Sequence, residues 1–301
     1  MNRRTLLTAT VAAGAVLPTI APTDATAAPA KIRNGVSTAD GARLFVRDWG
    51  TGEPIVFLAG WTLTTDAWSY LMAPLSEQGF RCVAYDRRGH GQSDDPGRGY
   101  DYDTLADDLA RVLDALDLQG VTLVAHSMAG GEAVRYLTKH GQAGRVTKVL
   151  FLAPTLPCIA QKADNPHGVP PQMLDQSLQD IRADFPGWLA ANEAPFVTPA
   201  TSQAMRDWIK AMMLQASMKA VIDCNRAMTQ ADFRQEMRSL DLPCLVIQGD
   251  MDASAPLEIT GKPAAALLKN GSLKIYPGAP HGLFVTHAAQ LSRDIAAFAR
   301  A

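Results

Sequence analysis

From residue 35 onward, short apolar segments alternate with longer segments in which apolar residues recur at helical spacing. The short segments are continuously apolar and end near Gly, Asp, Ser or Pro, as strands buried on both faces of a parallel sheet do. The amphipathic segment 103–120 ends at Gly120, which is typical of a helix terminus. This alternation predicts an α/β fold, with a mostly parallel, doubly wound sheet and helices on both faces. The predicted buried strands are residues 54–60, 81–86, 121–127, 146–154, 243–250 and 272–278.

The alternation stops between about Pro154 and Leu240, where no clear strand pattern is found. This stretch is rich in proline and large apolar residues and contains several helical segments. A helical insertion between two strands of an α/β sheet predicts a lid over the strand ends, where ligands bind. The predicted organisation is an α/β core at 31–153 and 241–301 with a helical lid at 154–240. Side chains expected to line a pocket under the lid are Trp188, Phe196, Trp208, Met212 and Leu283.

Residues 1–28 are interpreted as an export signal. They begin with the pair Arg3-Arg4, continue through an apolar run at 6–17 and reach an Ala-x-Ala pattern at Ala25–Ala27. The run is too short to cross a bilayer, which takes about 20 residues. Paired arginines indicate the twin-arginine type of signal, which exports folded proteins. A transmembrane anchor or a disordered tail is the alternative. We expect a periplasmic or secreted protein with no membrane attachment after signal removal.

The composition favours a globular enzyme with a small-molecule substrate. Hydrophobic residues make up 47% and charged residues 19% of the 301-residue chain, and its formal net charge is −2. Such a chain can bury a core and carry a lid, and its near-neutral charge gives no reason to expect a nucleic-acid or membrane-surface partner. The four cysteines lack the spacing of a metal site. We expect Cys158 and Cys224 to stay unpaired, because a protein that folds before export does not need the bond. The oligomeric state is left open.

Ser127 stands where a predicted strand runs into a predicted helix, in the segment LVAHSMAGGEAV. A nucleophilic serine at such a turn has a strained backbone that brings strand and helix very close, so the residues two positions to either side must be small. Glycine is usual at both, and here Ala125 and Ala129 stand in their place. Since alanine adds only a methyl group, the sequence still predicts a nucleophile at Ser127.

A serine hydroxyl becomes a good nucleophile only when a base takes its proton and an acid orients that base. At this kind of turn the partners follow along the chain in the order acid, then histidine. The segment LVIQGDMDASAP offers Asp252, with Asp250 as the alternative acid, and IYPGAPHGLF offers His281. His90 is expected to stabilise a tight turn, and His126 is expected to point away from the serine hydroxyl. The remaining histidines, His140, His167 and His287, are weaker candidates.

Attack on a carbonyl also needs hydrogen-bond donors for the oxyanion that forms. One expected donor is the backbone N–H of Met128, directly after the nucleophile at a helix N-terminus. The other is the backbone N–H of Trp61, in the loop after the strand PIVFLAG. The side chain of Trp61 has the simpler alternative of packing within that loop.

Several segments around these residues resemble the α/β-hydrolase superfamily, and within it the cofactor-free, non-haem chloroperoxidase and arylesterase branch. They are YDRRGHGQSDDP, DYDTLADDL, HSMAGGEAVRY, ITGKPAAALL and APHGLFVTHAAQL, in the order and spacing of that branch. The resemblance implies a triad of Ser127, His281 and Asp252, an oxyanion hole from Trp61 and Met128, and no metal or organic cofactor.

The resemblance also bears on the acid and on the oxyanion loop. It favours Asp252 over Asp250, because the acid of the family is the fourth residue of a Gly-x-x-Asp turn. The oxyanion loop departs from the family, with Ala59-Gly60-Trp61-Thr62 where His-Gly-Trp-Pro is usual. Loss of the histidine removes a polar anchor of the loop. Loss of the proline changes the loop's shape and disfavours a peroxide-dependent reaction more than ester or lactone hydrolysis.

These features predict a serine hydrolase that cleaves small, mostly apolar carboxylic esters or lactones through an acyl-enzyme. A cofactor-free perhydrolase or haloperoxidase, using peroxide at the same serine, is the first alternative. A non-catalytic ligand-binding protein on a hydrolase scaffold is the second. The physiological substrate, the choice between linear ester and lactone, and enantioselectivity stay open, because they depend on how the lid packs.

Overall fold

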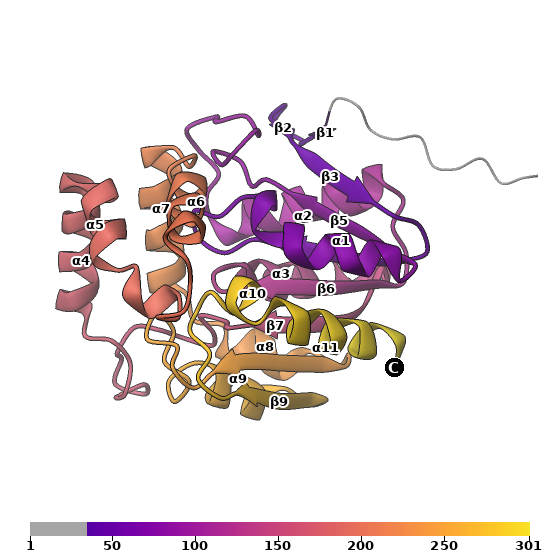
Figure 1. Cartoon of the computed structure of the whole chain (residues 1–301). Coiled ribbons are helices and arrows are strands. Elements are labelled where there is room, and N and C mark those ends of the chain that lie inside the picture. The colour runs from indigo at the N-terminus through magenta and orange to yellow at the C-terminus, as the bar shows by residue number, and fades with distance from the viewer. Residues whose placement is uncertain (1–34) are drawn as a thin grey trace, which may run out of the picture. The chain divides into compact units, whose positions relative to one another are not determined.

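A seven-stranded sheet forms the centre of residues 35–301, the part of the chain that the computed structural model describes (Figure 1). The strand order is β3-β5-β4-β6-β7-β8-β9, and only the edge strand β3 runs antiparallel to its neighbour. The predicted α/β fold with a mostly parallel sheet is confirmed. The strands are β3 (Val46–Trp49), β4 (Glu53–Leu58), β5 (Phe80–Tyr85), β6 (Val121–His126), β7 (Val146–Leu152), β8 (Cys244–Gly249) and β9 (Gly271–Tyr276), with a separate hairpin of β1 (Val36–Ser37) and β2 (Arg43–Leu44).

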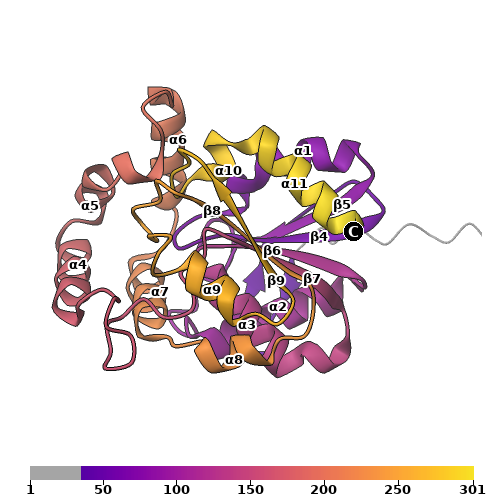
Figure 2. The ribbon, with the colours of Figure 1, turned by 90° about the horizontal axis from the view of Figure 1, so that it is seen from below.

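Helices cover both faces of the sheet because its central strands are apolar on both sides. Along β4, Ile55 and Phe57 pack into one core, and Val56 and Leu58 into the other. Figure 2 shows α1 and α11 on one face, and α2, α3, α8 and α9 on the other. The elements of the core are η1 (Thr65–Trp68), α1 (Ser69–Glu77), α2 (Tyr102–Ala115), α3 (Ala129–His140), η2 (Gly141–Ala143), α8 (Arg234–Ser239), α9 (Gly261–Leu267), α10 (Leu283–Thr286) and α11 (Ala288–Arg300).

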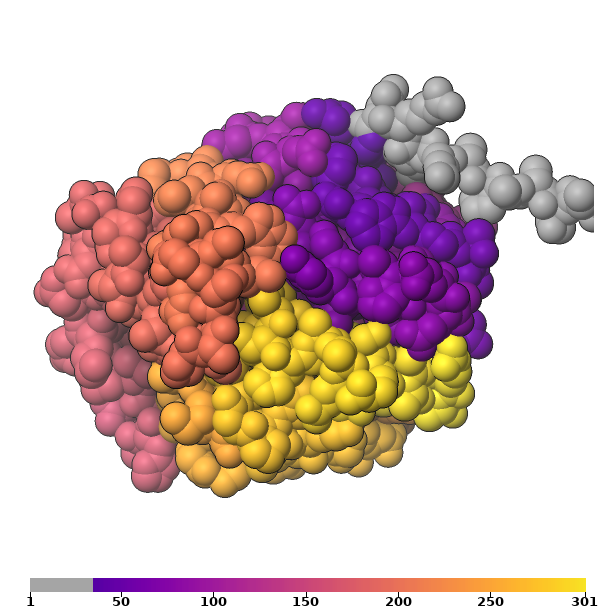
Figure 3. All heavy atoms as spheres, viewed as in Figure 1, coloured from indigo at the N-terminus to yellow at the C-terminus, as the bar shows by residue number. Residues whose placement is uncertain are grey.

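A helical insertion lies between β7 and β8, as the sequence predicted. Four of its helices gather beyond one end of the sheet, pink to orange in Figures 1 and 2. In the space-filling view they abut both the early and the late parts of the chain (Figure 3). Helix α8, although inside the predicted lid range, packs against α3 and α9 of the core. The inserted elements are α4 (Pro171–Ala183), α5 (Phe185–Ala191), η3 (Ala194–Phe196), α6 (Gln203–Met213) and α7 (Met218–Gln230).

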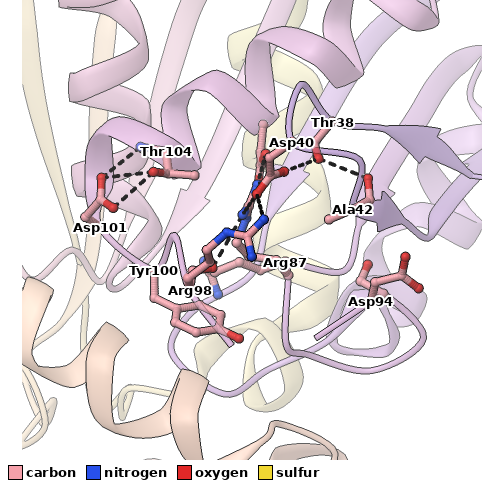
Figure 4. A network of polar contacts seen from close by, with 12 residues as sticks. Thr38, Asp40, Ala42, Arg87, Asp94, Arg98, Tyr100, Asp101 and Thr104 are labelled. Atoms are coloured by element: carbon pink, nitrogen blue, oxygen red, sulfur yellow. Dashed lines mark hydrogen bonds and ion pairs between the residues drawn. The ribbon is translucent and has the colours of Figure 1, made fainter. Parts of the chain in front are cut away.

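Arg88, which follows β5, links the β1–β2 hairpin to α2 through hydrogen bonds. Its guanidinium donates twice to Asp108 of α2, at 2.7 Å each, and to Asp40 between β1 and β2 at 3.0 Å. Asp40 also accepts from the Thr38 hydroxyl at 2.6 Å (Figure 4). The hydrogen bond from Arg88 and that from Thr38 hold the pKa of Asp40 well below its ordinary range. Arg88 is nearly fully buried, so this pairing is what allows its charge to lie inside the fold.

The predicted export signal lies outside the described residues, so its assignment stays a prediction. Within residues 35–301, no helix has the length and apolar character needed to span a membrane. Cys158 and Cys224 are both free and buried, as are Cys82 and Cys244.

His90 lies in the turn after β5 and is fully buried. Its Nδ1 is 2.9 Å from the carbonyl oxygen of Arg88, and its Nε2 has no hydrogen-bond partner among residues 35–301. Burial, together with the positive charge of Arg87, lowers the pKa of His90 to about 3, and the carboxylate of Asp95 opposes this only weakly. The imidazole is therefore neutral in the folded protein, and Nδ1–H closes the turn.

The low pKa of His90 predicts a loss of stability in acid. An unfolded chain protonates this histidine below about pH 6.5, whereas the folded one resists protonation down to about pH 3. The contribution of His90 to the free energy of unfolding is complete above pH 6.5. It falls by about 1.4 kcal/mol per pH unit as the pH drops from 6.5 toward 3. The free energy of unfolding is measured in urea at several pH values from 7 to 4.5 and plotted against pH. Below pH 6.5, the slope of this plot should be shallower by about 1.4 kcal/mol per pH unit in His90→Asn than in the wild type. Equal slopes in the two proteins would contradict the assignment.

Candidate active site

Ser127 occupies a tight turn between β6 and α3. Its φ of +56° lies in the left-handed region, which residues other than glycine rarely adopt. Its N–H donates to the carbonyl of Leu152 at 2.9 Å, and Ala125 and Ala129 are completely buried beside it. The loop after β4 also approaches closely: a Cβ on Gly60 would lie 3.2 Å from the Cβ of Ser127. Small residues are therefore required on both sides of the serine.

The structure brings Ser127, His281 and Asp252 into one hydrogen-bonded chain. The Nε2 of His281 is 2.9 Å from the Ser127 hydroxyl, and its Nδ1 is 2.8 Å from a carboxylate oxygen of Asp252. Since a carboxylate only accepts, Nδ1 carries the proton and Nε2 is left to accept from the serine. All three residues are at least 95% buried, so solvent competes little with these bonds.

Asp252 rather than Asp250 contacts the histidine. The second oxygen of Asp252 accepts from the N–H of Ala255 at 2.8 Å, which fixes the carboxylate. Asp250 lies at the surface and accepts from the N–H of Gly278 at 2.7 Å. Gly249 precedes both, and a Cβ there would collide with the carbonyl of Ala279, so the loops after β8 and β9 can meet closely only with glycine at this position.

The two expected oxyanion donors belong to segments that meet at the serine. Met128 follows Ser127 directly, and Trp61 follows Gly60, where an added Cβ would lie 3.2 Å from the Cβ of Ser127. Neither backbone N–H donates to another group within residues 35–301. Both N–H groups are thus available to an incoming carbonyl oxygen.

Arg87 anchors the oxyanion loop, a contact that the sequence analysis missed. Its guanidinium donates to the carbonyl of Ala59 at 2.6 Å and to that of Gly60 at 3.5 Å. It also donates to the carboxylate of Glu132, in the first turn of α3, at 2.6 Å. The loop therefore has a polar anchor although Ala59 replaces the family's histidine. The only sequence signal was the paired arginines of YDRRGHGQS.

His126 packs against His281, although the sequence analysis assigned it no role beyond pointing away from the serine hydroxyl. Its ring centroid is 4.8 Å from that of His281 and 5.1 Å from that of Phe284. Burial, followed by the nearby His281, lowers the pKa of His126 far below its ordinary range, so the imidazole stays neutral. Its Nε2 lies 3.2 Å from the carbonyl of His281. As a donor there, it holds the backbone that carries the histidine.

A cavity of about 310 Å³ opens above Ser127 and His281. Of the predicted pocket residues, Trp188 and Phe196 line it. The prediction was wrong for Trp208, whose ring packs against Tyr70, and for Met212 and Leu283, which are buried in the core instead.

The orientation of α6 about its own axis explains why Trp208 and Met212 do not line the cavity. Helical neighbours four residues apart share a face, and the face of α6 that borders the cavity carries Ile209 and Met213. Trp208 and Met212 form the adjacent face. Several polar residues also border the cavity and were not predicted, because no local pattern marks them: Thr155, Glu193, Arg206, Lys210, Asn225 and Ser254.

The side chain of Trp61 joins the oxyanion loop to the lid. Its Nε1 donates to the carbonyl of Val221 in α7 at 2.9 Å. Its ring meets those of Phe185 and Trp188 edge-on, with centroids 5.8 and 5.5 Å apart. The Trp61 side chain therefore packs as a loop tryptophan against the lid.

The residues that the structure describes contain no group of three or more His, Cys, Asp or Glu side chains placed to hold a metal ion. The chemistry assembled around Ser127 is that of a nucleophile, a base and an acid.

Comparison with known proteins agrees with this geometry. Residues 53–288 match the family described as alpha/beta hydrolase fold, and the chain belongs to that family. Among its relatives, the non-heme chloroperoxidase CPO-A1 of Kitasatospora aureofaciens is 37% identical, over 82% of this chain and 91% of the relative. The bifunctional esterase/perhydrolase DCH of Acinetobacter calcoaceticus is 34% identical, over 88% and 99%.

A solved structure is also similar. The esterase EaEST from Exiguobacterium antarcticum superimposes with a TM-score of 0.86 at 27% identity, covering 89% of this chain and 99% of that one. The resemblance to the chloroperoxidase and esterase branch of the α/β hydrolases, inferred from the sequence, is thereby confirmed.

The buried pair of Arg87 and Glu132 predicts strong energetic coupling. Removing one partner leaves the other charge buried and unpaired, which costs about 3–5 kcal/mol of stability. We expect Arg87→Met and Glu132→Leu each to lose that amount in urea unfolding. The double variant should lose much less than the sum, because no charge is then stranded. Additive losses would mean that the two side chains act independently.

Proposed function

We propose that the protein is a serine hydrolase that cleaves small, mostly apolar carboxylic esters or lactones through an acyl-enzyme. The observation that carries the proposal is the unbroken hydrogen-bonded chain from Asp252 through His281 to Ser127, with distances of 2.8 and 2.9 Å, at the floor of a cavity. That order of acid, base and nucleophile is what acyl transfer from an ester requires.

In the proposed mechanism, His281 takes the proton of Ser127 at Nε2 while the serine oxygen attacks the ester carbonyl. The N–H groups of Met128 and Trp61 hold the oxyanion, and Asp252 stabilises the imidazolium. Collapse of this intermediate releases the alcohol, which takes the proton from His281. Water, deprotonated by His281, then attacks the acyl-enzyme and frees both the acid and Ser127.

The cavity supports a small substrate with apolar portions. Its volume of about 310 Å³ is near the lower end for small-molecule sites. Much of its lining is apolar, including Leu63, Ile159, Leu174, Leu189 and Val197. The relatives named as esterases support the same class of substrate.

A perhydrolase or haloperoxidase reaction at the same serine is the second candidate, favoured by the names of the relatives at 34–37% identity. The oxyanion loop supports hydrolysis over this reaction. Thr62 stands where the family usually has proline, and its φ of +64° is one that proline cannot adopt, since the proline ring fixes φ near −65°. The loop thus has its own backbone shape next to the oxyanion donor.

The test compares hydrolysis of p-nitrophenyl esters and simple lactones by the wild type and Ser127→Ala. We expect kcat/KM to fall at least about a thousandfold in the variant. Ser254→Ala, which removes another hydroxyl bordering the cavity, is the matched control and should retain activity. Peroxide-dependent halogenation of a dye that is lost in Ser127→Ala and kept in Ser254→Ala would support the perhydrolase or haloperoxidase reaction. A folded wild type without any turnover would favour a binding protein on a hydrolase scaffold.

We also propose that residues 1–28 direct export of the folded protein by the twin-arginine route. The support is the sequence pattern of paired arginines, short apolar run and Ala-x-Ala. The N-terminus of the protein isolated from its native host should begin shortly after Ala27. A first residue at Met1 in the exported fraction, or absence from that fraction, would contradict the proposal.

A further inference from the structure

The loop that carries His281 is bonded to the lid as well as to the core. On the core side, Asp252 contacts the imidazole at 2.8 Å, and the Nε2 of His126 lies 3.2 Å from the backbone carbonyl of His281. On the lid side, the N–H of Gly282 donates to the carbonyl of Phe196 at 2.9 Å. The ring of Phe196 also meets the imidazole edge-on, with centroids 5.6 Å apart. His281 is therefore held between the core and the lid.

Gly282 allows the lid to come this close. A Cβ added to Gly282 would collide with the carbonyl oxygen of Phe196 and would lie 2.9 Å from two atoms of its ring. The φ of Gly282 is −82°, a value that every residue type can adopt. Glycine is thus required here by the close approach of the lid and not by the backbone conformation.

Arg206 of α6 fixes the lid segment that contacts this loop. The segment, residues 193–201, connects α5 to α6 and contains only the short helix η3. The guanidinium donates to the carbonyl of Thr198 at 2.8 Å, to the carbonyl of Thr201 at 3.0 Å and to the carboxylate of Glu193 at 2.9 Å. One side chain therefore bonds to the segment at three positions along its length.

The other charged residues of α6 do not share this role. Lys210 pairs with Glu193 at 2.8 Å and with Asp207 at 3.2 Å. Neither Lys210 nor Asp207 bonds to a backbone group of residues 193–201 in the described part of the chain. The difference follows from chemistry, because a guanidinium presents a rigid planar fork of N–H donors, whereas an ammonium is a compact point charge.

The alignment of His281 is the quantity that this contact affects. A general base acts only within hydrogen-bond reach of the proton that it takes. A misplacement of about 1 Å, caused by a change away from the reacting atoms, can lower a rate by about a hundredfold. A lid segment that shifts would release Phe196 from Gly282 and from the imidazole beside it.

We propose that Arg206 is a positioning residue of the active site, because it holds residues 193–201 in the conformation that keeps His281 aligned for proton transfer. This rests on the proposed function, in which His281 is the base. Arg206 also borders the cavity, so the alternative role is direct contact with the substrate. The two roles differ in their kinetic effects.

The first test measures kcat and KM for p-nitrophenyl acetate and p-nitrophenyl hexanoate in the wild type, Arg206→Met and Arg206→Lys. We expect kcat to fall about tenfold for both esters in Arg206→Met, with KM within about twofold, because the base is misaligned whatever the acyl chain. Arg206→Lys should lose nearly as much, since lysine keeps the charge and lacks the fork.

Two outcomes of this test would overturn the proposal. A loss confined to the hexanoate, or expressed mainly as a raised KM, would assign Arg206 to substrate binding. Full activity in Arg206→Lys would mean that the charge alone matters. The matched control is Asp207→Asn, which breaks an ion pair at the next position of α6 without touching the backbone of residues 193–201. It should keep kcat within about twofold of the wild type, and a loss like that of Arg206→Met would also contradict the proposal.

A double-mutant cycle tests the route by which Arg206 acts. Gly282→Ala pushes Phe196 away from the opposite side while the hydrogen bonds of Arg206 stay in place. Because both changes break the same contact, Arg206→Met combined with Gly282→Ala should lose little more kcat than the worse single variant. If the two losses multiply, Arg206 does not act through this contact.

Hydrogen exchange follows the contact without turnover. We expect the peptide that contains Gly282 to exchange at least about tenfold faster in Arg206→Met than in the wild type, and at the wild-type rate in Asp207→Asn. Unchanged exchange in β6 shows that the variant is folded. Should β6 also lose protection in Arg206→Met, the same comparison in Arg206→Lys decides.

The exchange measurement also separates this proposal from the proposed function. If the wild type hydrolyses no ester, the proposed function fails, and exchange at Gly282 still decides whether Arg206 holds the loop. If esters are hydrolysed but both kcat and exchange in Arg206→Met stay at wild-type values, the positioning role alone fails.

Discussion

At Ser127 the chain leaves the central strand of the sheet with a φ of +56° and enters α3 at once. This left-handed turn lifts the hydroxyl out of the sheet, and it can form only if nothing bulky lies beside it. The alanines at 125 and 129 and the glycine at 60 meet that condition in three different segments. Once the turn is formed, the loops after β8 and β9 need only supply an acid and a histidine at the same edge of the sheet, where parallel strands all end.

Two neighbouring arginines, Arg87 and Arg88, fix the segments that surround the turn at Ser127. Arg87 links the oxyanion loop to the first turn of α3, and Arg88 links α2 to the β1–β2 hairpin. Both guanidiniums are buried, so each must keep its carboxylate partner. The loop at Ala59 and Gly60 and the first turn of α3 are therefore held by the same side chain, Arg87. This shared support explains how the loop keeps its place although Ala59 stands where the family resemblance led us to expect a histidine.

The strands and the order of the chemical residues could be predicted because both are local patterns. Apolar runs marked the strands, and the serine, acid and histidine follow strand ends in a fixed order. Tertiary geometry decided the rest. Asp250 and Asp252 are two residues apart. The resemblance to the family favoured Asp252, and the meeting of two loops places that carboxylate against His281. Trp208 was expected in the pocket because aromatic residues of the lid suit an apolar wall, but the orientation of α6 directs it toward Tyr70. The pairing of Arg87 with Glu132 spans 45 positions, so no local pattern predicts which carboxylate the arginine meets.

The bond from the Trp61 indole to the Val221 carbonyl has a consequence for how such proteins diversify. Insertions between the strands of a sheet are often treated as interchangeable parts, recombined among relatives to change specificity. Here one residue belongs to both halves: its backbone is part of the loop proposed to hold the oxyanion, and its indole is hydrogen-bonded to the inserted segment. A chimaera that takes this insertion from a relative would have to bring a matching partner for the indole. Recombination and directed evolution at this boundary would therefore succeed only when the oxyanion loop and α7 are inherited together.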